Sequence, residues 1–398
     1  MNRKEFLKNG AALGIGLPFL SLLLDGCGVD FIDNPDLTVN FSGKVLIVGA
    51  GAAGLTAGYI LQQQGIDFEI IEATSVYGGR VKRSEDFIDL PIDLGAEWIH
   101  REPSVLAEII NDPTVNAHID FVNYTPQTVQ AYRNGKRRDM NWLGDLQSEY
   151  KFKSTTWYGF FEQYILPAVQ DRTRLDQPVQ EIDYSGDMIS ITTADSSVFT
   201  GEKVLITVPV SILKNGAINF VPGLPQEKIN SFGKIQMDAG LKVFMEFSQR
   251  FYPDVLFFGG LGAIFQDTKA YYDAVFRKDT SRHVMGLFAI NEEAAAFTDL
   301  GSDQAIFQAV LAELDDVFDG QASQYYLNHI VQNWSAEPFI QGSYSYDFDG
   351  KQKDIVENIF EPVDEKVYFA GEALSLDNQA TVHGACESAY KAMARLLA

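Results

Sequence analysis

The sequence contains few cysteines, few histidines and few basic residues. Its 398 residues include two cysteines, Cys27 and Cys386, which do not make a disulfide framework. The five histidines are scattered and the cysteines are far apart, so the sequence has no metal-ligand pattern and no metal site is expected. The 31 basic residues are outnumbered by 54 acidic ones, which gives a net charge of −23. This balance argues against nucleic-acid binding, since contacts to phosphates require a basic surface.

The N-terminal region also lacks a long uninterrupted apolar run. The apolar residues 11–24 are interrupted by Gly and Pro and are too few for a membrane span. They follow a basic start at Arg3 and Lys4, so residues 1–30 are predicted to be a signal or leader segment outside the fold. The start resembles a twin-arginine signal with Lys as its second basic residue, and the segment that ends at Cys27 resembles a bacterial lipobox. We therefore expect export to the bacterial cell envelope or periplasm, with Cys27 as the candidate lipid anchor. An uncleaved leader or a plain membrane anchor is the alternative.

The rest of the chain is organised around a glycine-rich turn. Residues 44–48 are a short apolar run that predicts a buried strand, and residues 49–54 then match the pattern G-x-G-x-x-G. Residues 55–64 are good helix formers, and residues 68–71 predict a second strand that ends on Glu72. Strand, glycines, helix, second strand and terminal acid occur together, which favours a dinucleotide-binding unit over an ordinary βαβ unit.

Each residue type in this unit has a physical task. Gly49 makes the tight turn, Gly51 lets the backbone approach a pyrophosphate, and Gly54 lets the helix lie close to the strand. The helix N-terminus, which includes Ala53, offers N–H groups and a partial positive charge to the anion. Glu72 can accept hydrogen bonds from both ribose hydroxyls and would hinder a 2′-phosphate, so FAD or NAD is favoured over NADP.

Six ordered segments resemble the flavin amine oxidase superfamily, which includes monoamine oxidases, polyamine oxidases, flavin histone demethylases and L-amino-acid oxidases. The first segment continues from Glu72 to the residues Gly-Gly-Arg. The second contains the sequence Gly-Ala-Glu-Trp-Ile-His, which is most similar to that of polyamine oxidases. The resemblance extends from Gly43 to the end of the chain and implies FAD as the cofactor. The segments are residues 72–80, 93–100, 178–182, 204–213, 368–372 and 381–385.

The resemblance implies an α/β fold in which a Rossmann-like FAD-binding domain is interleaved with a mixed sheet-plus-helix substrate domain. The FAD-binding domain is expected to comprise residues 43–111, 176–222 and 338–398. The substrate-binding domain is expected to comprise residues 112–175 and 223–337.

The same resemblance implies which residues hold FAD. Arg80 would reach the flavin or the pyrophosphate, Val179 would hold the adenine end through its backbone, and Glu372 would contact the ribityl or pyrophosphate region. A terminal helix that begins near Val382 would direct its N–H groups at the pyrimidine end of the flavin. Together with the residues of the glycine-rich unit, the implied cofactor-binding residues are Gly79, Arg80, Gly95, Ala96, Glu97, Trp98, Val179, Gly371, Glu372, Thr381 and Val382.

Three side chains are the candidate catalytic residues. Lys242 lies in an alternating apolar segment, residues 240–247, that resembles the family's K-V-x-L-x-F strand, whose lysine holds a water molecule against flavin N5. Without that resemblance, a strand lysine would be read as solvated. His100 would face the substrate channel, and Tyr344 would form an aromatic wall beside the flavin. Ser343 stands where monoamine oxidases carry the cysteine that bonds to the flavin, so FAD is expected to be non-covalent.

The expected function is oxidation of a primary or secondary amine, either a monoamine or a polyamine. A hydride would pass to the flavin, and molecular oxygen would reoxidise it, giving an imine or aldehyde and hydrogen peroxide. Alternatives within the superfamily are an L-amino-acid oxidase, in which Arg101 would bind the carboxylate, and a carotenoid-type desaturase. A non-catalytic flavoprotein is the alternative from a different functional class.

Overall fold

The structure is a computed structural model that describes residues 32, 34–146, 149–259 and 268–398. The predicted leader, residues 1–30, and the candidate anchor Cys27 lie outside the described residues. Within the described part, no helix combines the length and the apolar character needed to cross a bilayer.

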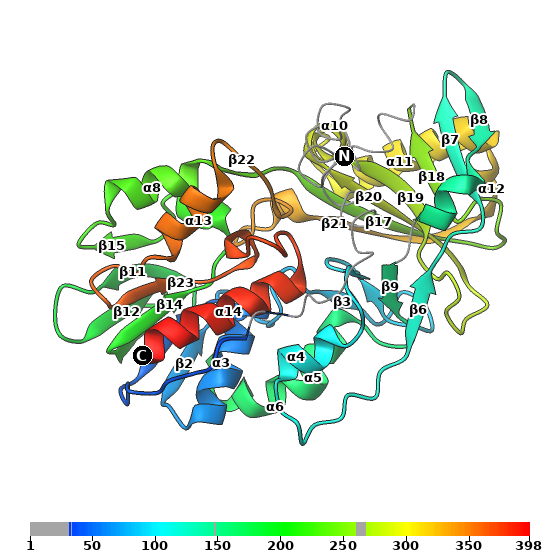
Figure 1. Ribbon diagram of the computed structural model, residues 1–398. Coiled ribbons are helices and arrows are strands. Elements are labelled where there is room, and N and C mark those ends of the chain that lie inside the picture. The colour runs from blue at the N-terminus through cyan, green and yellow to red at the C-terminus, as the bar shows by residue number, and fades with distance from the viewer. Residues whose placement is uncertain (1–31, 33, 147–148, 260–267) are drawn as a thin grey trace, which may run out of the picture.

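A five-stranded parallel sheet forms the centre of one half of the molecule (Figure 1). All four residues of β1 are buried, as expected for a parallel strand that is covered on both faces. β1 and β2 are joined by helix α3 (Ala52–Gln64), which ends at Gly65 in the left-handed conformation. In spatial order the strands are β10 (Thr173–Arg174), β2 (Phe68–Ile71), β1 (Val45–Val48), β14 (Lys203–Ile206) and β23 (Val367–Phe369).

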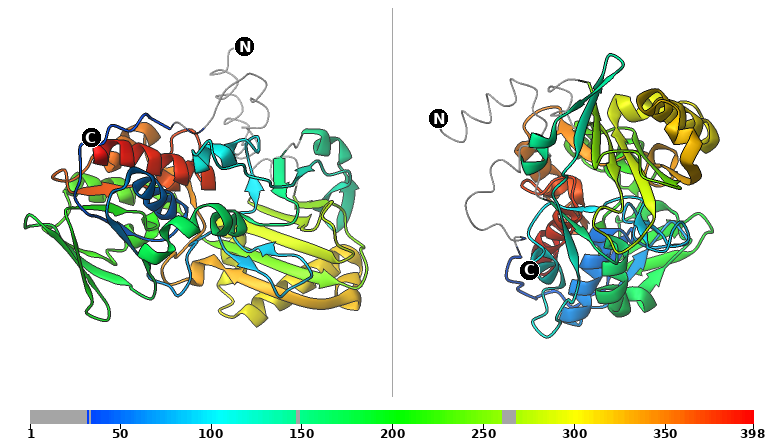
Figure 2. Two further views of the ribbon diagram at one scale, coloured as in Figure 1. Left: turned by 90° about the horizontal axis from the view of Figure 1, so that it is seen from below. Right: turned by 90° about the vertical axis from the view of Figure 1, so that its right-hand side faces the viewer.

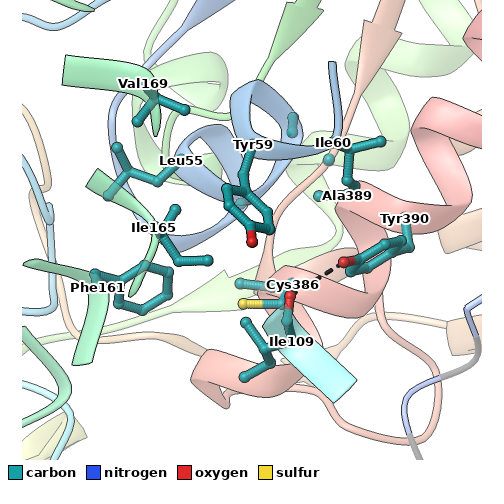
Figure 3. Packing of buried hydrophobic residues seen from close by; sticks show 14 of the residues in the cluster. Leu55, Tyr59, Ile60, Ile109, Phe161, Ile165, Val169, Cys386, Ala389 and Tyr390 are labelled. Carbon is teal, nitrogen blue, oxygen red and sulfur yellow. Dashed lines mark hydrogen bonds between the residues drawn. The ribbon is translucent and has the colours of Figure 1, made fainter. Parts of the chain in front are cut away.

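Helices cover one face of this sheet. Val45 and Ile47 point into a cluster with α3 and the C-terminal helix α14 (Val382–Leu397), which lie side by side. Figure 3 shows Tyr59 of α3 and Cys386 of α14 within this cluster. The hydroxyl of Tyr390 in α14 donates a hydrogen bond to the carbonyl of Ile109, at 3.0 Å. The remaining helices of this cluster are α4 (Val105–Ile110), α5 (Trp157–Tyr164) and α6 (Leu166–Val169).

The opposite face of the parallel sheet packs on a small second sheet. The alternate β1 residues, Leu46 and Val48, join a cluster with Ile182 and Ile191 of that sheet. Its strands are, in spatial order, β13 (Val198–Gly201), β12 (Ile189–Thr193), β11 (Val179–Asp183) and β15 (Asn219–Val221). Helices α7 (Val210–Lys214), α8 (Gln226–Gly233) and α13 (Gln352–Phe360) complete this side.

A seven-stranded sheet forms the second half of the molecule (Figures 1 and 2). Its neighbouring strands are antiparallel except for the β7–β18 pair. In spatial order they are β21 (Tyr326–Asn333), β17 (Gly240–Phe247), β20 (His283–Ile290), β19 (Lys269–Asp273), β18 (Val255–Phe258), β7 (Val129–Arg133) and β8 (Lys136–Asp139). One face is covered by α10 (Asn291–Thr298), α11 (Asp303–Phe318) and α12 (Gln321–Tyr325).

Strand β17 separates its side chains as its alternating pattern predicts. Leu241 and Val243 point into the helix-covered cluster, and Phe244 points into the cluster on the other face. Lys242 lies on the Phe244 face, which is the face that borders the cavity described below. Lys242 is 5% exposed, so the structure contradicts the solvated reading of this lysine.

Shorter strands form three further small sheets. β3 (Arg83–Ser84) pairs with β4 (Ile92–Asp93), and β16 (Ile235–Met237) pairs with β22 (Ser345–Phe348). A three-stranded sheet has the order β5 (Trp98–Ile99), β9 (Glu149–Phe152) and β6 (Phe121–Tyr124). The 3₁₀ segments are η1 (Asn141–Leu146), η2 (Gln170–Arg172), η3 (Trp334–Ala336) and η4 (Glu372–Leu374).

The predicted fold class is confirmed: the protein is α/β, with a parallel sheet in one half and a mixed sheet with helices in the other. The predicted domain limits stay a prediction. Two segments assigned to the substrate domain pack against the parallel-sheet half: residues 157–174 join its helical layer and its sheet edge, and residues 226–237 join the cluster of α13. Their buried aromatic and aliphatic side chains account for this packing.

Candidate active site

A cavity of about 1860 Å³ extends from the glycine-rich turn to strands β17, β18, β19 and β20. It brings together residues from all parts of the chain. Of the predicted site residues, Gly54 does not line it, and all the others do: Gly49, Gly51, Ala53, Glu72, Gly79, Arg80, Gly95, Ala96, Glu97, Trp98, His100, Val179, Lys242, Tyr344, Gly371, Glu372, Thr381 and Val382.

The glycine-rich turn lies at one end of this cavity. Gly49 has a φ of +105°, a conformation that side chains rarely adopt, and its N–H donates to the carbonyl of Ile71 at 2.8 Å. A Cβ at Gly51 would meet only the carbonyl of Gly78, at 4.0 Å, so the backbone there is open to a close-lying ligand. A Cβ at Gly54 would lie 1.9 Å from the carbonyl oxygen of Gly49, which is the close contact of helix and strand that the pattern predicts.

Glu72 closes this end from the tip of β2. It is 7% exposed. One carboxylate oxygen accepts the N–H of Ala50 at 2.7 Å, and the other accepts the N–H and hydroxyl of Thr74 at 2.9 and 2.8 Å. These bonds fix the carboxylate beside the N-terminus of α3, whose first turn contains no acidic residue. An anion at the helix N-terminus would therefore meet no competing charge within that turn.

Arg80 and Glu372 meet in the middle of the cavity wall. The Nη1 of Arg80 donates to Glu372 Oε1 at 2.9 Å and to the carbonyl of Ser343 at 3.0 Å. Glu372 also accepts the Ser345 hydroxyl at 2.5 Å and the Ala380 N–H at 3.2 Å. The contact joins segments that are 292 residues apart in the sequence and sets the position of the last loop before α14.

Helix α14 points its N-terminus at the cavity. Thr381 is its N-cap, and its hydroxyl accepts the N–H of Gly384 at 2.9 Å. His383 in the first turn is 2% exposed, and among the described residues its Nδ1 has no hydrogen-bond partner. Burial, with smaller contributions from the charges of His100 and Arg101, lowers the pKa of His383 to about 3, so this imidazole is neutral.

At the far end of the cavity, Lys242 belongs to a buried cluster of charges. Its Nζ lies 2.8 Å from Glu97 Oε2, and the Nζ of Lys151 lies 2.5 Å from Glu97 Oε1. The hydroxyl of Tyr272 also donates to Glu97 Oε2, at 2.5 Å. Burial alone would raise the pKa of Glu97, but the charges of Lys151 and Lys242 outweigh it and hold the pKa well below its usual range. Glu97 is therefore a carboxylate, and it is saturated by three donors.

A second acid and a third lysine adjoin this cluster. Asp93 is 2% exposed and accepts the N–H of Trp157 at 3.2 Å. Burial raises the pKa of Asp93 to about 8, although the charge of Lys278 opposes the rise. Burial lowers the pKa of Lys278, which is itself 9% exposed. Buried ionisable groups with displaced pKa values are typical of functional sites.

The other candidate residues form the rim. His100 Nδ1 lies 2.9 Å from Glu149 Oε1, and both residues line the cavity. Arg101 donates from Nε and Nη2 to Asn378 Oδ1, at 3.1 and 2.8 Å. Tyr344 is half-buried in the cavity wall.

The structure places no cysteine of its described residues in the cavity wall. Ser343 lines the cavity, and its N–H donates to the carbonyl of Asp238 at 2.8 Å. Cys386 is buried in α14, where it accepts the hydroxyl hydrogen bond of Thr56. The described residues contain no group of His, Cys, Asp and Glu side chains that could hold a metal ion.

Sequence reasoning missed several residues of the site. They are Asp93, Lys151, Tyr272, Lys278, Glu149 and Asn378. For Lys151 and Tyr272 the signal is Glu97 itself, because an acid between small and apolar residues, Ala96 and Trp98, needs a buried cation. Which cation it finds depends on the pairing of β5 with β9, where Lys151 lies opposite Trp98.

This fold and this cavity define a class: two-part α/β proteins with a dinucleotide turn at one end and a buried lysine at the other. Residues 52–169 and 161–397 match the family model of flavin-containing amine oxidoreductases. The chain belongs to that family.

The relatives and solved structures agree with this class. The chain is 26% identical to human lysine-specific histone demethylase 2 over 89% of this chain and 53% of the relative, so it spans about half the length of that relative. It is 23% identical to polyamine oxidase 3 of Oryza sativa subsp. japonica, over 86% of each chain. The structure of cyclohexylamine oxidase from Brevibacterium oxydans IH-35A has a TM-score of 0.73 at 15% identity, and covers 90% of this chain and 99% of that one. A putrescine oxidase structure has a TM-score of 0.72 at 14% identity and covers 89% of this chain.

The cofactor of the protein is FAD. The residues present fit it: the backbone at Gly51 is open, Glu72 stands at the tip of β2, and α3 and α14 both direct their N-termini at the cavity. Two helix N-termini in one cavity suit a ligand that carries a pyrophosphate at one place and negative charge at another.

Proposed function

We propose that the protein is an FAD-dependent oxidase of a primary or secondary amine, either a monoamine or a polyamine. The observation that carries this proposal is the buried Lys242–Glu97 pair in the wall of the cavity that also contains the glycine-rich turn. The polyamine, putrescine and cyclohexylamine oxidases to which the chain is similar support an amine as the substrate class. When bound, FAD would supply the chemistry that these residues lack, namely an acceptor for the hydride of the carbon next to the amine nitrogen and passage of the two electrons to molecular oxygen, which gives hydrogen peroxide.

We assign the cofactor-holding residues as the sequence implies. The turn with Gly49 and Gly51, together with Ala53 at the N-terminus of α3, would bind the pyrophosphate, and Glu72 would accept the ribose hydroxyls. The remaining cofactor contacts would come from Gly79, Arg80, Gly95, Ala96, Glu97, Trp98, Val179, Gly371, Glu372, Thr381 and Val382, and Gly54 would let α3 lie close to the turn.

At the reacting end, the side chains would supply charge, orientation and exclusion of water. Lys242 would place a cation at the FAD side of the wall, because Glu97 holds its Nζ at a fixed place. Trp98, Tyr272 and Tyr344 line the same space and would exclude water from the substrate carbon. His100 with Glu149 would orient the amine at the rim. The imine would then leave and be hydrolysed to an aldehyde.

The test is a peroxide-coupled screen of the FAD-loaded protein against monoamines, diamines, polyamines and L-amino acids. We expect peroxide with at least one amine. Peroxide with L-amino acids alone would assign the alternative in which Arg101, which also lines the cavity, binds a carboxylate. Absence of turnover with every compound would contradict the proposal and would favour a desaturase or a non-catalytic flavoprotein.

We further propose that FAD is bound without a covalent bond, because Ser343 best matches the position at which monoamine oxidases carry the cysteine that bonds to the flavin. Acid precipitation should release yellow flavin into the supernatant. Flavin that stays in the protein pellet would contradict this.

We also propose export to the bacterial cell envelope as a lipoprotein, supported by the basic start, the apolar segment 11–24 and Cys27. Cells that express the full chain should incorporate labelled fatty acid into the wild type and not into Cys27→Ser. Full-length protein without label in either variant would contradict the lipid anchor.

A further inference from the structure

A second lysine lies behind the cavity wall and shares a carboxylate with Lys242. The Nζ of Lys151 lies 2.5 Å from one oxygen of Glu97, and the Nζ of Lys242 lies 2.8 Å from the other. Lys242 and Glu97 line the cavity, whereas Lys151 is 1% exposed and does not line it. Glu97 is therefore held between one ammonium group that borders the cavity and one that is enclosed by protein.

The enclosed lysine is held by aromatic rings. Its Nζ lies 4.6 Å from the ring centre of Trp98, 5.2 Å from that of Tyr124 and 5.0 Å from that of Tyr272. These rings come from β5, β6 and β19. Ring faces attract a cation, so the three rings fix the place of the Lys151 ammonium group.

This arrangement determines the charge that the cavity meets. The charge of Lys151 neutralises Glu97, so the charge of Lys242 is left over and the three groups together carry one positive charge. Without Lys151, Glu97 would neutralise Lys242, and the wall would carry no net charge. Without Glu97, the two lysines would carry two positive charges. Asp93 and Lys278 interact electrostatically with the same groups, and both side chains are kept in such variants.

We propose that Lys151 is a positioning residue of the amine-oxidising site: it neutralises and orients Glu97, so that Lys242 presents a net positive charge to bound FAD. This inference rests on the proposed function, because it takes Lys242 to face FAD. A positive charge next to FAD favours its reduced form, which carries more negative charge. Lys151 would thus act on the cofactor without touching it.

The test is the midpoint potential of FAD in the loaded protein, measured by spectroelectrochemistry in the wild type and three variants. In Lys151→Met we expect the equilibrium constant for reduction to fall about tenfold, which is about 30 mV for a two-electron couple. In Glu97→Gln we expect the equilibrium constant for reduction to rise. In the double variant Lys151→Met/Glu97→Gln, where one positive charge is restored, we expect a return to the wild-type value. If Lys151 had a purely structural role, the midpoint potential of the double variant would differ from the wild-type value at least as much as those of the single variants.

Two control variants separate this inference from the proposed function. Lys242→Met should lower the potential, and Lys269→Met should not, because Lys269 is a lysine of the same sheet that pairs with Glu313 at 2.6 Å outside the cavity wall. A wild-type potential in Lys151→Met, with a lowered one in Lys242→Met, would overturn the inference alone. A wild-type potential in Lys242→Met would contradict both the inference and the proposed role of Lys242 beside FAD.

The test remains decisive if Lys151→Met does not retain FAD. The comparison is then between Glu97→Gln and the double variant, which differ by the same single charge. The double variant should have the lower potential, by about the same 30 mV. Equal potentials in these two variants would overturn the inference.

Discussion

At one end of the cavity, the lining residues come mainly from two stretches that are close in the sequence, within residues 48–53 and 71–86. At the other end they are charged side chains that come from separate elements: Glu97 lies 145 residues from Lys242 and 175 residues from Tyr272 in the sequence. The first end binds through N–H groups and a helix dipole, which need no titratable side chain. The second end depends on three charges that lie together away from water, with the carboxylate of Glu97 between two lysines.

This difference determines how each end fails. A backbone site is damaged by added volume, because a single methyl group can fill the space that a ligand needs. A buried charge cluster is damaged by the loss of one partner, because the remaining charge is then unpaired and costs several kcal/mol. The predictions below separate these two kinds of damage.

The largest effect is expected at Lys242. Lys242→Met keeps the length of the side chain and removes the charge, so the protein should stay folded and retain FAD. Reduction by amine and reoxidation by oxygen, measured separately by stopped flow, should show at least one step slowed by about tenfold or more, since positioned groups of this kind contribute about 10²–10⁴-fold.

Lys269→Met is the matched control for this experiment, because it removes a charge from the same sheet at a place that does not line the cavity. It should leave both rates unchanged. If both half-reactions run at wild-type rates in Lys242→Met, then Lys242 is a structural residue of β17.

The sequence predicts the first end of the cavity well because everything it needs is local. Four consecutive apolar residues form β1, the glycines follow at once, and Glu72 comes directly after β2. The G-x-G-x-x-G spacing reports a backbone geometry that the residues themselves require. Strand β17 is predicted equally well, because its alternation assigns Lys242 and Leu241 to opposite faces.

The sequence could not predict the charge cluster, because long-range pairing decides which cation reaches Glu97. Lys151 is one of 31 basic residues, and nothing next to it in the sequence indicates burial. Its place follows from the register of β5 and β9, which sets it opposite Trp98. In the same way, no local pattern shows that residues 157–169 cover α3, since an aromatic helix packs equally well on either half.

A smaller effect is expected at the glycines, where two neighbouring positions should fail differently. In Gly54→Ala the new Cβ would lie 1.9 Å from the backbone oxygen of Gly49, so helix and strand must separate, and the free energy of unfolding should fall by about 3 kcal/mol. In Gly51→Ala the nearest atom is 4.0 Å away, so stability should fall by less than about 1 kcal/mol, the size of an N-cap replacement, while the affinity for FAD falls by about tenfold.

Denaturant unfolding of both proteins and FAD titration of Gly51→Ala check this pair. A Gly51→Ala protein that binds FAD as tightly as the wild type would show that the pyrophosphate does not approach this backbone. A Gly54→Ala protein of wild-type stability would show that the contact of α3 with the turn is looser than 1.9 Å implies.

The smallest effect is expected from His383, which contrasts with the charge cluster because it is buried in its neutral form. Its pKa is lowered to about 3, chiefly by burial, from the ordinary value of 6.5. Below pH 6.5 the unfolded chain takes up a proton that the folded chain does not, so the free energy of unfolding should fall by about 1 kcal/mol between pH 6.5 and 5.5 on account of this residue. His383→Gln cannot take up that proton, so its stability should depend less on pH by this amount.

His118→Gln is the control, because His118 is exposed. The measurement is the free energy of unfolding of each protein, from denaturant unfolding at several pH values. If the wild type and His383→Gln lose stability in parallel on acidification, then the imidazole is protonated in the folded protein and has a partner at the N-terminus of α14.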